Sequence, residues 1–218
     1  NMDFALARRN MVDCQILPNK ITDKRVIEVM RGLPREVFLP TMKHGFAYVD
    51  HAICIGKERF LMEPMIIGGM LQVLELSSSD VALTIGCGTG YSVAALSKLV
   101  DTVVALEENT YFSDIASKTF VNQEINNIVL VSGKLNKGYS RQAPYDVIFF
   151  DGGVGEVPQN IKDQLADLGR AVAVEIRSNG IGRIALYKKF HGKVSRIDLF
   201  DAITPLLPGF EIKKVFVL

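Results

Sequence analysis

The chain has 218 residues, of which 48% are hydrophobic and 22% charged, as is usual for an ordinary globular protein. Its formal net charge is +1 with lysines and arginines scattered, which disfavours a nucleic-acid partner because phosphate binding needs a broad basic face. Three cysteines and three histidines without ligand spacing argue against a disulfide framework and a metal site. No apolar run is long enough to span a bilayer, so we expect a cytoplasmic protein without a membrane partner.

The first part of the chain, to about residue 55, has helical character. An irregular apolar stripe over residues 4–12 predicts one helix. Thr22 is expected to cap a second helix, which Gly32 ends. Pro64 suits the first turn of a third helix.

From residue 80 onward, short apolar runs alternate with segments of helical spacing. The alternation predicts a parallel sheet covered on both faces, and the β-prone segments after residue 180 predict an antiparallel ending. The predicted strands are 81–85, 102–106, 128–131, 147–150, 171–176, 183–188, 194–200 and 210–217, and the helices between them are 91–99, 111–120 and 158–168. We expect one α/β domain over 1–218, with an N-terminal helical segment that forms the substrate cleft (1–78) and a doubly wound, cofactor-binding sheet (79–218).

The most informative segment is a glycine-rich turn between the first predicted strand and the next helix. Glycine lets the backbone turn tightly and lets a ligand approach without a Cβ in the way. Glu107, with Glu108 beside it, ends the second strand about twenty residues further on, where a carboxylate can accept hydrogen bonds from ribose hydroxyls. The turn consists of Gly86, Cys87, Gly88, Thr89, Gly90 and Tyr91.

Two classes of nucleoside ligand compete for this turn. A dinucleotide site has Gly-x-Gly-x-x-Gly, whose last glycine allows close packing of helix on strand. Here that position is the bulky Tyr91, so the spacing favours S-adenosylmethionine over NAD. An NAD-dependent oxidoreductase is the weaker alternative. The purely structural interpretation is a tight turn that binds no ligand.

Five segments carry a resemblance to one family. Residues 33–40 are similar to its "VPR-x-x-F-x-P" stretch, 47–50 to "AY-x-D", 85–91 to its nucleotide turn, 143–148 to "APYD-x-I", and 205–209 to its closing motif. Over nearly its whole length the sequence resembles a divergent bacterial branch of the protein-L-isoaspartate O-methyltransferases. The resemblance implies a seven-stranded, Rossmann-like methyltransferase sheet and S-adenosyl-L-methionine as cofactor. It also implies methyl transfer to the free carboxylate of isoaspartyl residues in damaged proteins or peptides.

The segment that matches the family's "G-Q-T-I-S-Q-P" departs from it. Met62 stands at the serine position, and a thioether cannot donate a hydrogen bond to a substrate carboxylate. Arg59 is a candidate clamp for that carboxylate. Glu63 and Pro64 complete the residues expected at the substrate cleft, and no catalytic residue is predicted.

The expected cofactor contacts also depart from the family. Gly133 and Lys134 replace its "G-D-G" loop, so backbone atoms would have to contact the adenine. Asp151, which follows the fourth predicted strand, is expected to serve as a further acceptor. These departures leave two alternatives open: a methyltransferase with a different acceptor, and a non-catalytic protein that binds an adenosyl ligand or a partner. The sequence predicts no oligomeric state.

Overall fold

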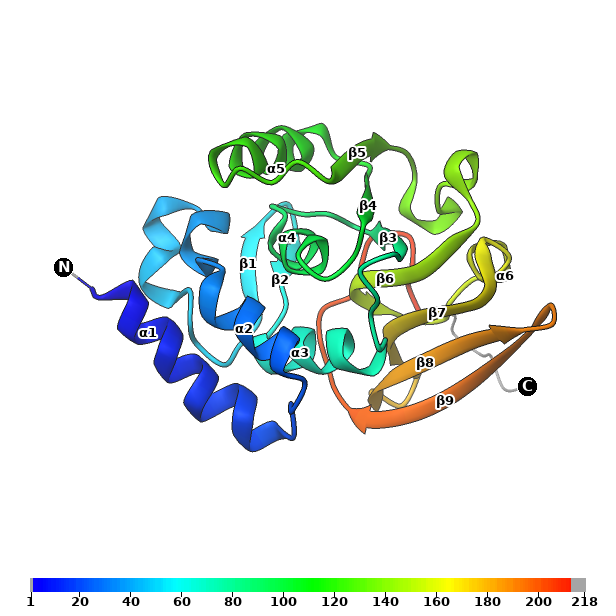
Figure 1. Cartoon of the computed structure of the whole chain (residues 1–218), viewed down its shortest axis with the longest axis horizontal. Helices are drawn as coiled ribbons and strands as arrows, with labels where there is room; N and C mark the ends of the chain where they lie inside the picture. Colours follow the sequence, from blue (N-terminus) through cyan, green and yellow to red (C-terminus); the bar gives the residue numbers. More distant parts are fainter. Residues whose placement is uncertain (1, 213–218) are drawn as a thin grey trace.

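The chain folds around a seven-stranded sheet in a computed structural model that describes residues 2–212 (Figure 1). The strand order is β5–β4–β3–β6–β7–β8–β9, parallel from β5 to β7 and antiparallel at β8 and β9. The predicted α/β sheet with an antiparallel ending is therefore confirmed. The strands are β3 (Val81–Ile85), β4 (Thr102–Glu107), β5 (Ile128–Ser132), β6 (Tyr145–Val154), β7 (Leu165–Ile176), β8 (Gly182–Phe190) and β9 (Lys193–Asp201).

The N-terminal segment packs beside this sheet as helices and one small hairpin, mostly on the side away from β8 and β9 in Figure 1. Its last helix, residues 64–73, reaches Ile184 of β8. None of the helices within residues 2–212 is long and apolar enough to cross a membrane. The helices are α1 (Phe4–Met11), α2 (Lys24–Gly32), α3 (Pro64–Val73), α4 (Tyr91–Ser97), α5 (Thr110–Asn122) and α6 (Gln159–Lys162), and the hairpin is β1 (Ile53–Gly56) with β2 (Arg59–Leu61). Shorter helical turns span Val12–Ile16, Leu17–Asn19, Arg35–Phe38, Thr41–Phe46, Leu135–Lys137 and Ser140–Gln142.

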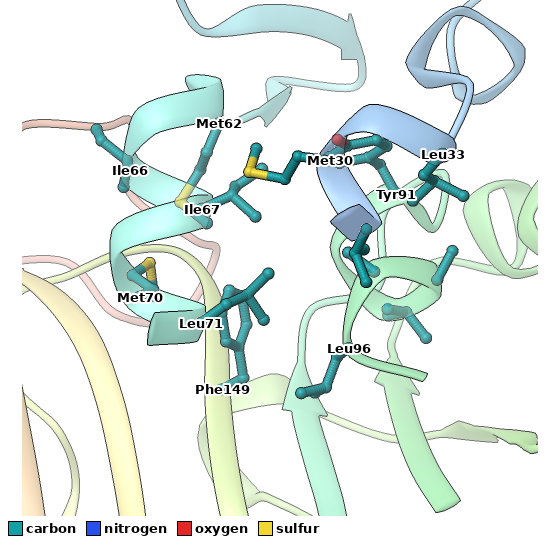
Figure 2. Packing of buried hydrophobic residues seen from close by; sticks show 14 of the residues in the cluster. Met30, Leu33, Met62, Ile66, Ile67, Met70, Leu71, Tyr91, Leu96 and Phe149 are labelled. Carbon is teal, nitrogen blue, oxygen red and sulfur yellow. The ribbon is translucent and has the colours of Figure 1, made fainter. Parts of the chain in front are cut away.

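Both faces of the parallel strands β3, β4 and β6 are buried, whereas the edge strand β5 is partly exposed. In β4, Val103 and Ala105 join one hydrophobic cluster, whereas Val104 and Leu106 join a second. The first cluster includes side chains of α2, α3, α4 and α5. Figure 2 shows members from the first three of these helices. The second face carries little helix and is covered by Leu135, Ile161, Leu207 and Phe210. The first cluster also joins the predicted N-terminal segment to the sheet.

The predicted helix over 158–168 is wrong beyond its first turn. Helix α6 ends at Lys162, and β7 begins at Leu165, opposite Tyr145 of β6. Leu165 is buried in this strand, whereas Leu168 is 66% exposed. The expected helix end was Gly169, which instead lies within β7, directly after Leu168 with its left-handed φ of 64°.

Three further expectations need correction. Asp23, not Thr22, caps α2, and its side chain accepts a hydrogen bond from the backbone N–H of Arg25 at 2.9 Å. The helical character predicted up to residue 55 misses the β1–β2 hairpin. Of the predicted strand 210–217, residues 210–212 are not in a strand and residues 213–217 lie outside the described part of the chain.

Candidate functional site

The glycine turn lies where predicted, between β3 and α4. Gly86 and Gly88 have left-handed φ values of 82° and 53°, which glycine adopts without strain. Every residue from Gly86 to Tyr91 is buried. A Cβ on Gly86 would lie 3.1 Å from Arg59 Nη2 and 3.0 Å from Leu207 Cδ2, and one on Gly88 would lie 3.0 Å from Ile55 Cδ1. Side chains of this protein therefore pack directly against the turn.

Gly90 has a different purpose from the other two glycines. A Cβ on Gly90 would lie 2.6 Å from the Phe120 ring of α5. Its φ of 104° is also one that other residues rarely adopt. Gly90 thus allows α4 and α5 to pack closely, which corrects the expectation that all three glycines face a ligand slot.

Glu107 ends β4 at the same edge of the sheet, and its carboxylate already has many hydrogen-bond donors. Arg59 forms a two-pronged ion pair with it, Nη1 to Oε1 at 2.9 Å and Nη2 to Oε2 at 3.1 Å. The two side chains are only 5% and 0% exposed. Three backbone N–H groups also donate to the carboxylate, from Gly88 at 2.8 Å, Glu108 at 3.0 Å and Asn109 at 3.1 Å.

The ion pair differs from both sequence expectations. Glu107 was expected to face a ribose and Arg59 a substrate carboxylate, and in the structure each is the partner of the other. The β1–β2 hairpin carries Ile55 and Arg59 over the glycine turn. Two short apolar runs on either side of residues 56–59 were the signal that could have revealed this hairpin. Leu207, which also packs against the glycine turn, lies within residues 205–209, the segment that resembles the closing motif of the family.

Cys87 and Asp151 lie close to the ion pair, and burial raises the pKa of both. The pKa of the Cys87 thiol is raised chiefly by burial and further by the charges of Glu107 and Asp151, so a reactive thiolate is disfavoured. Burial raises the pKa of Asp151 from 3.8 to about 7, while the nearby Ser92 hydroxyl and Arg59 guanidinium oppose the rise. Within residues 2–212, Asp151 Oδ1 has no hydrogen-bond partner. Asp151 is thus at the predicted edge, with one oxygen available to a ligand.

Replacing Asp151 by asparagine should change the pH dependence of stability. From about pH 4 to about pH 7 the folded protein keeps the Asp151 proton and the unfolded chain does not. Native-state proton uptake therefore stabilises the protein at low pH, and this stabilisation is lost as the pH rises through 7. When the pH is raised from 5 to 7, the free energy of unfolding of the wild type should fall by about 2 kcal/mol more than that of Asp151→Asn. Urea unfolding at the two pH values measures this difference. A difference between the two proteins that does not change with pH would contradict this expectation.

The other expected cofactor contacts lie around the same edge. Gly133 follows β5, and a Cβ there would lie 3.3 Å from Leu106 Cδ1. Lys134 and Glu108 are exposed, so the adjacent Glu108 does not share the buried position of Glu107. The Tyr91 ring is buried, 4.9 Å from the guanidinium carbon of Arg35.

The expected substrate-cleft residues separate in the structure. Met62 is fully buried and lies among side chains of α2 and α3, as Figure 2 shows, so it belongs to the core and not to a cleft. Pro64 is buried in the first turn of α3. Glu63 lines a groove of about 680 Å³, in which its Oε2 has no partner among the described residues. Asp50, Arg183, Asp201 and Ile203 also line this groove.

The groups present at the edge of the sheet fit an adenosyl ligand in their chemistry. Gly86 and Gly88 offer backbone without side chains, and Glu107 offers a buried carboxylate at the end of the neighbouring strand. What differs from an open site is that Arg59, Leu207 and Ile55 lie in front of these groups.

The sequence matches one family over most of its length. The model of the family described as "Protein-L-isoaspartate(D-aspartate) O-methyltransferase" matches residues 7–203. Two relatives carry the name protein-L-isoaspartate O-methyltransferase. The one from Koribacter versatilis is 32% identical over 205 residues, which are 94% of this chain and 92% of the relative. The one from Methanoculleus marisnigri is 37% identical over 166 residues, 76% of each chain.

Solved structures show the same fold. A protein-L-isoaspartate O-methyltransferase structure has a TM-score of 0.79 at 24% identity, over 93% of this chain and 66% of the other. A Plasmodium falciparum structure, described as a putative member of the same class in complex with S-adenosyl-L-homocysteine, has a TM-score of 0.77 at 16% identity, over 94% of this chain and 99% of the other. With its family match over residues 7–203, the chain belongs to the protein-L-isoaspartate(D-aspartate) O-methyltransferase family.

Proposed function

We propose that the protein is an S-adenosylmethionine-dependent carboxyl O-methyltransferase that acts on isoaspartyl residues of damaged proteins. One observation supports this most directly: in a chain of this family, the glycine turn and Glu107 lie side by side at the carboxyl ends of β3 and β4. Ligands of open α/β sheets bind at this edge.

The proposed reaction asks little of acid–base chemistry. S-adenosylmethionine supplies an electrophilic methyl group on a sulfonium. The acceptor carboxylate is already ionised near pH 7, so the protein has to align the reacting atoms and not remove a proton. In this proposal Gly86 and Gly88 allow close approach of the cofactor, and Glu107 accepts hydrogen bonds from its ribose. The backbone at Gly133 and Lys134 borders the adenine, because a lysine side chain cannot accept from an adenine amino group.

The groove lined by Glu63 is the place where we propose that the acceptor residue binds. It lies at the same edge of the sheet, since Gly182 at the start of β8 pairs with Ile176 at the end of β7. Arg183 contributes a cation to the groove. Its Nη1 forms an ion pair with Asp201 Oδ1 at 3.4 Å, and its Nε has no hydrogen-bond partner within residues 2–212. A guanidinium is suited to bind a carboxylate. Arg183 was not among the residues that the sequence singled out.

The proposal also includes the cellular compartment, which is the cytoplasm, and the organisation of the chain as one domain. Cys14, Cys54 and Cys87 form no disulfide, which supports a reducing compartment such as the cytoplasm. A shared hydrophobic cluster supports one domain in which residues 1–78 and 79–218 fold together.

Two measurements test the proposed function. Calorimetric titration with S-adenosylhomocysteine tests the cofactor site, and a transfer assay with labelled S-adenosylmethionine tests the acceptor. The assay compares an isoaspartyl peptide with the same peptide carrying ordinary aspartate. We expect ligand binding, a higher melting temperature in excess ligand, and methylation of the isoaspartyl peptide alone. Binding without methylation would remove the acceptor assignment, and absence of binding would remove the methyltransferase function altogether.

A further inference from the structure

We propose that the Arg59–Glu107 ion pair closes the cofactor site of the free protein, and that Arg59 has to leave Glu107 before an adenosyl ligand can bind. This inference rests on the proposed function, because it concerns regulation of the same site. Arg59 would then act as a built-in competitor of the ribose. The protein would exist mainly in a closed form, from which the binding form is populated only when the ion pair opens.

The first argument is the hydrogen-bonding capacity of Glu107. A carboxylate has about four lone-pair positions, and in this structure it receives five donors. Two of them come from Arg59 and three from backbone N–H groups. The backbone donors belong to the turn and to the start of α5, so they are fixed by the fold. Ribose hydroxyls can therefore reach the carboxylate only if Arg59 gives up its two positions.

The second argument is the space in front of the glycine turn. The positions that a Cβ of Gly86 or Gly88 would occupy lie within 3.1 Å of Arg59, Leu207 or Ile55. A ligand that uses the missing side chains of these glycines would collide with the same three residues. The turn is thus covered from the hairpin and from the C-terminal loop.

The third argument is that the hairpin bearing Arg59 is held down over this edge by further contacts. The Arg59 guanidinium carbon lies 5.2 Å from the centre of the Phe112 ring, and Lys57 Nζ lies 5.9 Å from the Tyr111 ring, both in α5. Lys57 and Glu58 at the hairpin tip have left-handed φ values of 49° and 56°, which non-glycine residues seldom adopt. Ile53, Ile55 and Leu61 anchor the hairpin in the first hydrophobic cluster, so the opening that we propose is a movement of the Arg59 side chain and not of the whole hairpin.

Removing the guanidinium should therefore strengthen ligand binding. Arg59→Gln keeps a polar side chain but is shorter and lacks the charge and the two-pronged geometry. If the closed form dominates, the apparent dissociation constant is the intrinsic one divided by the open fraction. We expect Arg59→Gln to bind S-adenosylhomocysteine about tenfold or more tightly than the wild type by calorimetry. Arg59→Lys, which keeps the charge but not the paired contacts, should fall between the two.

Arg170 provides a matched control. It forms an ion pair with Asp80, Nη2 to Oδ2 at 2.8 Å, at the opposite edge of the sheet. Arg170→Gln should lower stability and leave the affinity for S-adenosylhomocysteine unchanged. In the wild type, NMR provides an independent readout: the Arg59 guanidinium protons should exchange slowly with solvent in the free protein and fast when the ligand saturates it.

The outcomes separate the inference from the proposed function. Ligand binding by the wild type that is equal to or tighter than binding by Arg59→Gln would overturn the closing role alone. Guanidinium protons that stay protected in the saturated complex would do the same, even if the Arg59→Gln variant failed to fold. Absence of binding by wild type, Arg59→Gln and Arg59→Lys would overturn the closing role together with the proposed function.

Discussion

Replacing Arg35 by leucine is expected to lower the free energy of unfolding by about 3–5 kcal/mol. The Arg35 side chain is 0% exposed and lies between the N-terminal segment and α4. Its Nε donates to the carbonyl of Ala47 and its Nη2 to the carbonyl of Met62, both at 2.6 Å. Leucine would leave these two buried carbonyls without donors, which costs about 1–3 kcal/mol for each group.

The charge of Arg35 adds to this effect. Its guanidinium lies over the Tyr91 ring, and Tyr91 is both the last residue of the glycine turn and the first residue of α4. Burial lowers the pKa of Arg35, and the neighbouring Tyr91, Tyr48 and Glu63 oppose that fall. The side chain thus joins the segment around Met62 to the helix that follows the turn. Its loss should loosen the candidate site as well as the fold.

Urea unfolding of Arg35→Leu measures this expectation. Arg9→Leu is the matched control, because Arg9 is an exposed arginine of α1, and its replacement should change the free energy of unfolding by less than about 0.5 kcal/mol. If Arg35→Leu were as stable as Arg9→Leu, the two carbonyl contacts would have no energetic importance. A well-packed leucine would then have replaced the buried charge without loss.

Much of the sheet could be predicted because its strands are local signals. The run Val81–Ile85 has the bounds that the sequence indicated, and the glycine turn follows it as expected. Short apolar runs of this kind are read from neighbours in sequence, without knowledge of distant contacts. The predicted helix over 158–168 failed for the same reason: its apolar spacing is compatible with a helix, and only pairing of Leu165 with Tyr145 decides for a strand.

The side chains that fill the candidate site could not be predicted in this way. Arg59 and Glu107 are 48 positions apart, and nothing local in the sequence says that they meet. The glycine turn indicates space for a ligand, but a guanidinium or a leucine from elsewhere in the chain can fill the same space. Met62 shows the converse: its position in a motif suggested a cleft, and its apolar side chain is instead part of the core.

Several buried charges are therefore concentrated at one edge of the sheet. Arg35, Arg59, Glu107 and Asp151 are each no more than 8% exposed. Burial raises the pKa of Asp151 to about 7, which favours the protonated carboxyl below that pH. Burying charged groups costs desolvation free energy and so contributes little to stability. Groups with shifted pKa values are more common at functional sites than elsewhere. This concentration of buried charges supports the view that this edge was shaped for a ligand.

Replacing Glu107 by glutamine is expected to lower the free energy of unfolding by about 3–5 kcal/mol, because the buried Arg59 guanidinium would lose its counter-charge. An amide also cannot accept on both sides: whichever way it is turned, its NH₂ group faces Arg59 and either the Gly88 N–H or the N–H groups of Glu108 and Asn109. Exposed Glu108 provides the control, since Glu108→Gln should leave stability nearly unchanged.

The double variant Arg59→Gln/Glu107→Gln shows how much of this loss belongs to the pair. The double variant contains no unpaired buried charge. Its loss in free energy of unfolding should therefore be smaller than the sum of the two single losses by about 2–3 kcal/mol. Urea unfolding of the wild type, both single variants and the double variant gives this coupling energy directly. Additive losses would mean that Arg59 and Glu107 stabilise the protein independently, and the ion pair would then be too weak to hold the hairpin over the glycine turn.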